Sequence, residues 1–418
     1  MNDDRIGPPL KGFPHGHPPV APHEIGALGW NLLAGDLPLP VAVLKRTALA
    51  HNLAWMQAFA RERGLDLAPH GKTTMSPQLF RRQLDAGAWG ITFSTVAQLA
   101  VGVAAGVRRA LIANQVFQAQ DLAAIQALRA AHPGLRVVFL VDSRAQLALI
   151  EAAAPEGASF EVLLEVGIAG GRTGCRGHDE ALALARALRA SRAVRLVGLE
   201  CYEGLGAKGD DAADTAYAQA LMQRVDALAR AIDAEGGFEG DEVLMSAGGS
   251  AIFDLVAGGL KPALARPVRG LLRSGCYVTH DHGHYRRLLD RVAARCGCAE
   301  TLRPALEVWT AVQSCPEPGL ALLTGGRRDL SFDIEMPHAV ARAQLGARSA
   351  TPAPAGWRIT GLNDQHAYLR WDDPADAPAV GERVALGISH PCTTFDKWRW
   401  MPVVDDDYRV VDAVTTVF

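Results

Sequence analysis

The chain has 418 residues, of which 49% are apolar and 21% are charged, and this composition is typical of a globular protein with a sizeable core. Lys and Arg total 42 and Asp and Glu total 45, so the formal charge of −3 argues against nucleic acid and membrane surfaces as partners. No apolar run approaches the roughly 20 residues of a membrane-spanning helix, and the N-terminus lacks the order of a signal peptide, so we expect a cytoplasmic protein.

The first part of the chain is predicted to be an irregular arm that leads into a helix. Residues 1–37 are rich in Pro, Gly and His and show no hydrophobic period. A short apolar run over 39–44 follows. Apolar residues then recur at helical spacing from Thr47 to Arg63, and Gly64 is a suitable stop for this helix.

Residues 38–277 repeat one pattern, in which a short apolar run and a polar turn precede an Ala-, Leu- and Arg-rich helical stretch. The later apolar runs begin at Leu65, Trp89, Arg109, Arg136, Phe160, Arg195, Glu242 and Val268. The helical stretches begin near Ser76, Val96, Asp121, Arg144, His178, Asp211 and Ser250. Strands that alternate with helices form parallel βαβ units, so eight runs predict an α/β fold, a (β/α)8 TIM barrel. A doubly wound sheet is the alternative, but no G-x-G-x-x-G motif follows the first strand.

The pattern changes after Tyr277. Ala-rich helical stretches give way to alternating apolar and polar segments that are separated by Pro and Gly turns. This alternation predicts a C-terminal mostly-β domain over 278–418, with a short helical piece near Arg287 to Arg295.

Lys72 is the candidate nucleophile, because the C-terminal ends of the strands carry the chemistry in a β/α barrel. The chain has six lysines, and Lys72 follows the first predicted barrel strand in LDLAPHGKTT. The GKT triplet is not a P-loop, since Asp66 stands where that motif requires a glycine. We therefore expect Lys72 to display its amine at the mouth of the barrel.

Two glycine-rich turns are candidates for phosphate binding. SAGGS (246–250) closes the seventh predicted strand and RSGCY (273–277) closes the eighth, and barrels commonly bind phosphate after these strands. Such turns also occur for purely structural reasons. A lysine amine and a phosphate cradle in one cleft are what pyridoxal phosphate requires, since the amine binds the cofactor covalently and backbone N–H groups hold its phosphate.

These motifs and their order resemble those of the alanine-racemase-like, fold-type III pyridoxal-phosphate enzymes. The resemblance rests on APHGKT, EVGIAGGRTGCR, GLECYEG, SAGGS and RSGCY, and it covers the chain from about residue 38. The C-terminal ISHPCTTFDKW is similar to the D-serine dehydratase and D-threonine aldolase branch, specifically its bacterial amino acid deaminase members. The resemblance implies that Lys72 carries the cofactor, that Arg172 lies beside its phenolic oxygen and that Tyr202 lies at its ring. It also implies that four residues present N–H groups to the phosphate, namely Gly248, Gly249, Gly275 and Cys276.

His390 and Cys392 are the candidate metal ligands. The segment RVALGISHPC is strand-like, and residues i and i+2 of a strand project to one face, so both side chains can meet one cation. A third residue, or water and substrate, would complete such a site, and the alternative is a buried His and Cys in a β core. The resemblance implies zinc at this pair, with manganese as the alternative metal. The aldolases of the branch carry an acidic residue at the second position, so Cys392 favours a dehydratase.

Other chemistry-bearing groups have less certain roles. The alternating histidines of VTHDHGHY, His280, His282 and His284, are candidates for a metal site, for the active-site mouth or for a solvated face. The seven cysteines are scattered and odd in number, which predicts reduced thiols, and Cys296 and Cys298 are expected to be structural. The roles of five further polar residues stay open: Asp333, Glu335, His338, Asp364 and His366.

Together these observations predict a pyridoxal-phosphate- and zinc-dependent dehydratase. It would convert a D-β-hydroxy amino acid such as D-serine to a 2-oxo acid and ammonia, with Lys72 taking the Cα proton and the metal binding the β-oxygen. A D-threonine-type aldolase is the alternative, and an amino acid racemase is a weaker one because it needs no metal. Outside enzymes, small pyridoxal-phosphate-binding homeostasis proteins share the barrel. They lack a C-terminal β domain, which counts against this alternative. A small-molecule amino acid is the expected partner, and the resemblance implies a homodimer.

Overall fold

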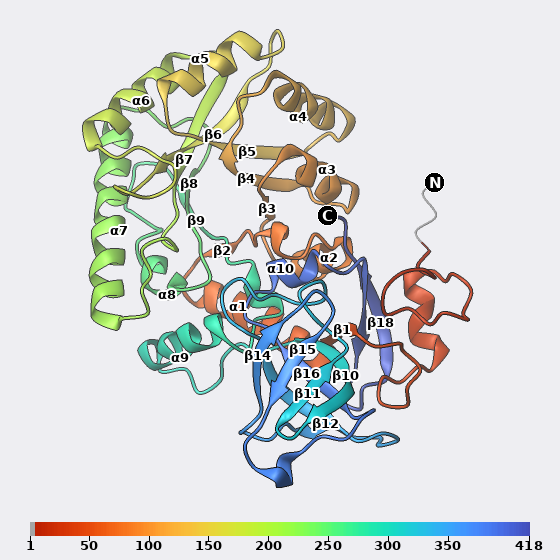
Figure 1. Ribbon diagram of the computed structural model, residues 1–418. Coiled ribbons are helices and arrows are strands. Elements are labelled where there is room, and N and C mark those ends of the chain that lie inside the picture. The colour runs from red at the N-terminus through yellow and green to blue at the C-terminus, as the bar shows by residue number, and fades with distance from the viewer. Residues whose placement is uncertain (1–4) are drawn as a thin grey trace.

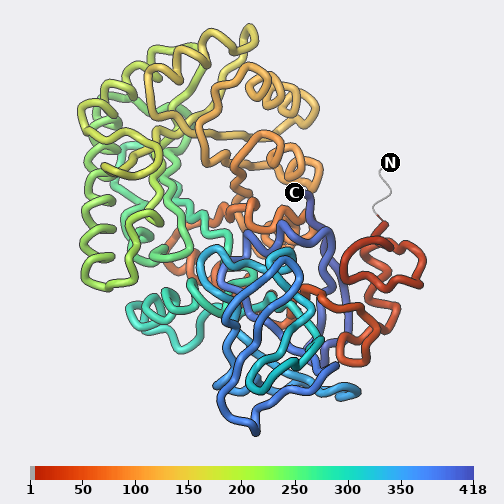
Figure 2. The backbone as a smooth tube through the Cα atoms, in the orientation of Figure 1, coloured from red at the N-terminus to blue at the C-terminus, as the bar shows by residue number. Residues whose placement is uncertain are grey.

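The structure is a computed structural model that describes residues 5–418, so residues 1–4 of the expected arm lie outside the described residues. It contains one sheet of eight strands that is surrounded by helices and one sheet of ten strands (Figure 1). The orange-to-green part of the chain forms the first sheet and its helices, and the blue C-terminal part forms most of the second (Figure 2).

The eight-stranded sheet is a closed parallel barrel. Its strands are β2 (Asp66–Leu67), β3 (Ile91–Phe93), β4 (Arg109–Gln115), β5 (Arg136–Val141), β6 (Phe160–Val166), β7 (Val194–Cys201), β8 (Val243–Ala247) and β9 (Val268–Leu272). They pair in the order β2-β9-β8-β7-β6-β5-β4-β3. The two ends meet at a bridge between His70 and Thr92, and the Trp89 N–H donates to the Leu67 carbonyl at 2.7 Å. The predicted TIM barrel is confirmed, since all eight predicted runs contain a barrel strand.

The helices begin close to the predicted positions. They are α1 (Arg46–Glu62), α2 (Pro77–Asp85), α3 (Val96–Ala104), α4 (Ala119–Ala131), α5 (Arg144–Ala153), α6 (His178–Ala190), α7 (Asp211–Ala234), α8 (Phe253–Ala257) and α9 (His284–Cys296). Four of them have a side-chain cap, in which Ser76, Thr95, Ser143 or Asp210 accepts a hydrogen bond from the N–H three residues ahead. Local capping chemistry therefore determines these starts. No helix among residues 5–418 has both the length and the apolar character needed to cross a membrane.

The barrel interior changes from apolar to polar toward the C-terminal ends of its strands. Alternate strand residues point inward, and the inward apolar side chains form a separate core cluster that includes Leu163, Val197, Leu244 and Leu271. The inward positions nearest the C-terminal ends carry polar groups instead, which are Glu165, Glu200, Ser246 and Arg273. These four residues are almost fully buried. Buried polar and charged groups therefore lie at the C-terminal end of the barrel, which is the end where active sites lie in this fold.

The ten-stranded sheet differs from the prediction in one strand. Its strands are β1 (Val41–Lys45), β10 (Leu306–Glu317), β11 (Leu320–Leu323), β12 (His338–Ala343), β13 (Thr351–Pro352), β14 (Arg358–Leu362), β15 (Ala367–Arg370), β16 (Arg383–Gly387), β17 (Trp400–Val404) and β18 (Val410–Thr415). Residues from 38 onward were assigned to the barrel, yet β1 lies between β10 and β17 of this second sheet. An apolar strand suits either sheet, and its local sequence does not encode its partners. The proposed boundary at residue 278 stays a prediction.

The described part of the N-terminal arm packs against the second sheet. It contains a short 3-10 helix, η1 (Pro22–Leu28), which lies beside β18, and Figure 2 shows this red segment next to the C-terminal strands. The Phe13 ring makes edge contacts with Trp30 and Trp400, with centroids 5.5 and 5.4 Å apart. Aromatic residues of the arm therefore attach it to the second sheet, although the arm contains little regular secondary structure.

Candidate active site

The predicted site residues of the barrel lie on loops that follow five of its strands. Lys72 follows β2, Arg172 follows β6, Tyr202 follows β7, Gly248 and Gly249 follow β8, and Gly275 and Cys276 follow β9. The C-terminal ends of parallel barrel strands meet at one end of the barrel. Because the barrel is closed, residues from separate motifs are brought into one region.

Lys72 lies in a one-turn 3-10 helix, η2 (Gly71–Thr73), directly above β2. The residue is exposed, although Gly71 and Thr73 on either side of it are buried. Desolvation around the amine, followed by the positive charge of Arg172, lowers the pKa of Lys72, and the thiolate character of Cys392 partly opposes this. A lowered pKa increases the fraction of neutral amine, which is the nucleophilic and basic form.

Arg172 and Tyr202 lie together at the mouth. The Arg172 guanidinium sits over the Tyr202 ring, 5.0 Å from its centroid, although the two residues come from different loops. Burial raises the pKa of the Tyr202 hydroxyl, so the phenol stays protonated at neutral pH. A cavity of about 700 Å³ opens beside this pair and is lined by Arg172 and by the loops after β6 and β7.

The two glycine-rich turns pack against each other and against the Lys72 loop. The Ser274 hydroxyl donates to the Gly249 carbonyl at 2.6 Å. A Cβ at Gly275 would lie 2.6 Å from the Thr73 hydroxyl oxygen, so glycine permits this close approach. The Gly249 N–H donates to the Glu203 carboxylate at 2.5 Å, and this N–H was predicted to face a phosphate. The Glu203 carboxyl group, whose pKa is raised by burial, thus accepts a hydrogen bond at the position where the sequence predicts a phosphate cradle.

A buried ion pair lies beneath these turns. Arg273 donates to the Glu200 carboxylate and, at 2.6 Å, to the Ser246 hydroxyl, and both charged side chains are almost fully buried. Burial raises the pKa of Glu200 to about 7, even though the Arg273 charge lowers it. Desolvation therefore outweighs ion pairing for this carboxyl, as it can for buried ion pairs.

His390 and Cys392 come together at the start of α10 (Cys392–Phe395), which lies between the barrel and the second sheet (Figure 1). The His390 Nδ1 lies 2.6 Å from the Asp333 carboxylate, which also accepts a hydrogen bond from Thr393 at 2.8 Å. Burial lowers the pKa of His390, but Cys392 and Asp333 outweigh it and raise that pKa to about 9. The sulfur of Cys392 lies 3.4 Å from the Thr73 hydroxyl and 3.8 Å from the Cys276 sulfur. The C-terminal pair therefore borders the Lys72 loop.

The donor chemistry at this mouth fits both predicted groups. Of the ten buried side-chain polar atoms without a hydrogen-bond partner among residues 5–418, four belong to residues of the motifs described above or next to them, namely His70 Nδ1, Glu200 Oε2, Glu203 Oε2 and Arg273 Nε. Such atoms favour a polar ligand or water in contact with them. The carboxylate on His390 Nδ1 leaves Nε2 as the donor, which is the arrangement that orients metal-binding histidines. Among residues 5–418, no group of three His, Cys, Asp or Glu side chains is placed to hold a metal ion.

The alternating histidines do not form an extended, one-sided row. His280 is buried, His282 is partly buried in the loop before α9, and His284 is the first residue of that helix. Burial lowers the pKa of both His280 and His282 to about 3, so these rings are neutral. The interpretation of this segment as a solvated face is not supported.

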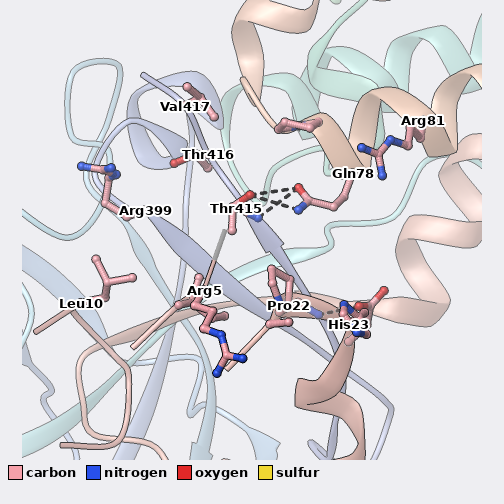
Figure 3. A pocket seen from close by; sticks show the side chains of 15 residues that line it. Arg5, Leu10, Pro22, His23, Gln78, Arg81, Arg399, Thr415, Thr416 and Val417 are labelled. Carbon is pink, nitrogen blue, oxygen red and sulfur yellow. Dashed lines mark hydrogen bonds between the residues drawn. The ribbon is translucent and has the colours of Figure 1, made fainter. Parts of the chain in front are cut away.

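Sequence reasoning missed the buried acidic groups and left Asp333 undecided. Glu200 and Glu203 belong to the same motif as Tyr202 and are buried. The charged Glu200 within an otherwise apolar strand was the signal in the sequence that could have identified a buried acidic group. Asp333 gave no local signal, because its partner His390 lies 57 residues away. A further cavity of about 770 Å³ between the N-terminal arm, α2 and β18 contains none of the predicted site residues (Figure 3).

Two family models match the chain. Residues 44–267 match the alanine racemase N-terminal domain, and residues 305–404 match the "Putative serine dehydratase domain". The first match covers the barrel strands β2 to β8 with the Lys72 and Tyr202 loops and ends directly before β9, and the second covers the segment with His390 and Cys392.

The chain is similar to enzymes of two activities. A D-threonine aldolase from Arthrobacter sp is 28% identical over 369 residues, which cover 88% of this chain and 89% of the aldolase. The D-threo-3-hydroxyaspartate dehydratase of Delftia sp. (strain HT23) is 28% identical over 373 residues, which cover 86% and 92% of the two chains. A crystal structure of D-threonine aldolase from Filomicrobium marinum aligns with a TM-score of 0.78 at 26% identity and covers 93% of this chain and 97% of that one.

The dehydratase has been solved in variant forms. One variant replaces a histidine by alanine, and another replaces a cysteine two positions later by alanine and is in the metal-free form. The cysteine variant aligns with a TM-score of 0.72 at 26% identity and covers 93% of this chain and 99% of that one.

Proposed function

Because the chain belongs to the alanine racemase N-terminal domain family, which has the pyridoxal-phosphate fold type III, we propose that it is a D-β-hydroxy amino acid dehydratase. It would convert a substrate such as D-serine to a 2-oxo acid and ammonia. The similar enzymes are named as lyases of D-threonine and D-threo-3-hydroxyaspartate, and both of these substrates carry a β-hydroxyl group. These relatives support a lyase of D-amino acids, and the choice of reaction and substrate is our proposal.

One observation carries the proposal. The Lys72 loop and Cys392 are neighbours, since Thr73 directly follows Lys72 and its hydroxyl lies 3.4 Å from the Cys392 sulfur, and the charge of Cys392 is among those that act on the pKa of the Lys72 amine. A substrate held at Lys72 would have its β-hydroxyl on the side of His390 and Cys392, because α10 packs against the Lys72 loop. An enzyme that breaks a bond at the substrate Cβ needs one catalytic group at Cα and another at the β-hydroxyl. A racemase needs catalytic groups at Cα alone.

Lys72 would serve as attachment point and as base. When bound, pyridoxal phosphate supplies an electron sink for negative charge at the substrate Cα. Arg172 over Tyr202 would orient the cofactor ring, and the turns at Gly249 and Gly275 would hold its phosphate, with the Gly249 N–H shared with or released from Glu203. The lowered pKa of Lys72 supports its part, because a neutral amine accepts the Cα proton.

His390 and Cys392 would hold the metal ion. A histidine nitrogen and a thiolate suit zinc, and Asp333 would fix the His390 ring with Nε2 toward the ion. Zinc would supply a Lewis acid for the substrate β-hydroxyl, which is a poor leaving group without one. The histidine and cysteine replaced in the dehydratase variants, the latter in a metal-free form, are likewise two positions apart.

Product analysis tests the proposal. Purified protein with added zinc is incubated with D-serine, D-threonine or D-threo-3-hydroxyaspartate, and 2-oxo acid, ammonia, glycine and aldehyde are measured separately. We expect 2-oxo acid and ammonia in equal amounts with little glycine. Glycine and aldehyde as main products would overturn the dehydratase and establish the aldolase.

Retro-aldol cleavage is the second candidate, and the named D-threonine aldolases support it directly. The presence of a cysteine at position 392 distinguishes the dehydratase from the aldolase. A thiolate favours zinc, whereas a carboxylate suits harder ions such as manganese. The variant Cys392→Asp should lose most elimination and gain cleavage with manganese. Equal elimination by this variant and the wild type would remove Cys392 as the basis of the choice.

A further inference from the structure

We propose that Cys276 and Cys392 form an oxidation site, at which a peroxide converts the two thiols to a disulfide that joins the barrel to the second sheet. The two sulfur atoms lie 3.8 Å apart, although the residues are 116 positions apart in the chain. A disulfide needs a separation of about 2.05 Å, so the sulfurs must approach by less than 2 Å. The proposal stands on the position of the thiols and does not depend on the proposed reaction.

The surroundings of Cys392 favour its role as the attacking sulfur. Its sulfur lies 3.8 Å from the Cys276 sulfur and 3.4 Å from the Thr73 hydroxyl oxygen, to which the Cys392 thiol donates. Cys392 is partly exposed, whereas Cys276 is only 6% exposed. The outer thiol can therefore meet the oxidant, and the inner one is placed to resolve the product.

The chemistry is balanced in two steps. The Cys392 thiolate attacks one oxygen of hydrogen peroxide, the O–O bond breaks, and sulfenic acid and, after proton uptake, one water are formed. The Cys276 thiol then attacks the Cys392 sulfur, the S–O bond breaks, and a disulfide and a second water are formed. The two thiols lose two electrons and two protons in total, and one peroxide is reduced to two waters.

The consequence for the protein follows from where the two residues lie. Cys276 begins η3 (Cys276–Val278) directly after Gly275, and Cys392 begins α10 beside His390. A disulfide would consume the Cys392 thiolate and tie α10 to the turn after β9. Oxidant would thereby switch off any function that needs a free Cys392, and a dithiol reductant would restore it.

The experiment uses the full chain, which is stripped of metal by a chelator and treated with hydrogen peroxide. Free thiols are then alkylated, and peptides are mapped by mass spectrometry without reduction. We expect a linked peptide pair with Cys276 and Cys392, a loss of two thiols per chain and full recovery with dithiothreitol. No such pair, while other cysteines become oxidised, would overturn the proposal.

Two variants sharpen the test. Cys276→Ser should leave Cys392 as a sulfenic acid that dimedone traps, because the resolving thiol is gone. Cys315→Ser, which removes an exposed thiol elsewhere, should form the linked pair as the wild type does. If Cys276→Ser gave no dimedone adduct at Cys392, the role of Cys392 as the attacking sulfur would be refuted.

Discussion

Lys72 shows how a single residue acquires a role from its position at a strand end. The side chain is exposed although its neighbours Gly71 and Thr73 are buried. Its removal therefore creates no cavity, and the residue can be tested without loss of the fold. The backbone bridge at His70, two residues before it, closes the barrel and fixes the loop.

The first prediction concerns covalent cofactor binding. Borohydride reduction of protein mixed with pyridoxal phosphate should fix the label on the peptide that contains Lys72. Lys72→Ala should lose the label and at least about a thousandfold of turnover, with an unchanged circular dichroism spectrum, because nucleophile and base are both removed. Lys261→Ala is the matched control, since Lys261 is also exposed but precedes β9 at the opposite end of the barrel. Label on another lysine would contradict the assignment.

The second prediction concerns stability and pH. The pKa of Glu200 is raised from its usual 4.5 to about 7, chiefly by burial, so the protonated carboxyl is favoured in the folded state. Its contribution to the free energy of unfolding is present below pH 4.5 and is lost as the pH rises toward 7. The wild type should lose stability relative to Glu200→Gln across this range in urea titrations. A constant difference between the two proteins would show that Glu200 titrates normally.

Two short elements build the second half of the candidate site. Helix α10 has four residues, and its start is held by hydrogen bonds to Asp333, which lies on the loop before β12. Thr394 in α10 also accepts the Ser331 N–H at 3.0 Å. The loop 330–337 and α10 therefore form one unit, which places His390 and Cys392 against η2.

The third prediction follows from this unit. Asp333→Asn keeps the shape of the side chain but removes the charge that orients and polarises the His390 ring. Zinc affinity should fall by about 10- to 100-fold, with the thermal midpoint nearly unchanged, because Asp333 is partly exposed. Competition with a chromophoric chelator measures the affinity. Asp364→Asn, at an exposed ion pair with Arg328, is the control. Equal zinc affinities of Asp333→Asn and the wild type would mean that Asp333 has no part in metal binding.

At the scale of the whole molecule, one apolar cluster runs from the barrel and its helices into the second sheet, and two smaller clusters fill the barrel interior and the contact between the N-terminal arm and the second sheet. The apolar clusters of the barrel and of the second sheet contain neither His390 nor Cys392. Trp309, Trp398 and Trp400 are fully buried in the second sheet or beside it, so their fluorescence reports on its packing. His390 and Cys392 therefore lie outside the apolar cores of the molecule.

The fourth prediction is that metal removal abolishes turnover but not folding. A chelator should stop product formation while circular dichroism and tryptophan emission stay constant, and zinc should restore activity. The lysine-bound cofactor band should also persist. A red shift of the emission on chelation would instead indicate a structural metal.

The fifth prediction concerns assembly. Three apolar side chains in one segment, Phe332, Ile334 and Met336, are 38%, 41% and 38% exposed. An exposed apolar cluster is typical of a contact surface, so sedimentation should give twice the chain mass of 44.5 kDa. Ile334→Asp should yield monomers, whereas Val380→Asp, at another exposed apolar residue, should not. A monomeric wild type would refute the expected homodimer.

The sequence by itself determined the local structure and the chemistry-bearing loops. Periodicity located the eight barrel strands, the capping residues marked helix starts, and LDLAPHGKTT placed Lys72 at a strand end. These features depend on residues a few positions apart, and such patterns can be read along the chain.

Only the tertiary structure decided which distant segments meet. β1 pairs with β10 and β17, Glu203 takes the Gly249 N–H, and Asp333 holds His390. The two sulfurs of Cys276 and Cys392 come within 3.8 Å across 116 residues. The physical reason is that strand partners and buried polar contacts depend on which surfaces pack against each other and exclude water. The sequence of one segment does not specify the distant segment against which it packs.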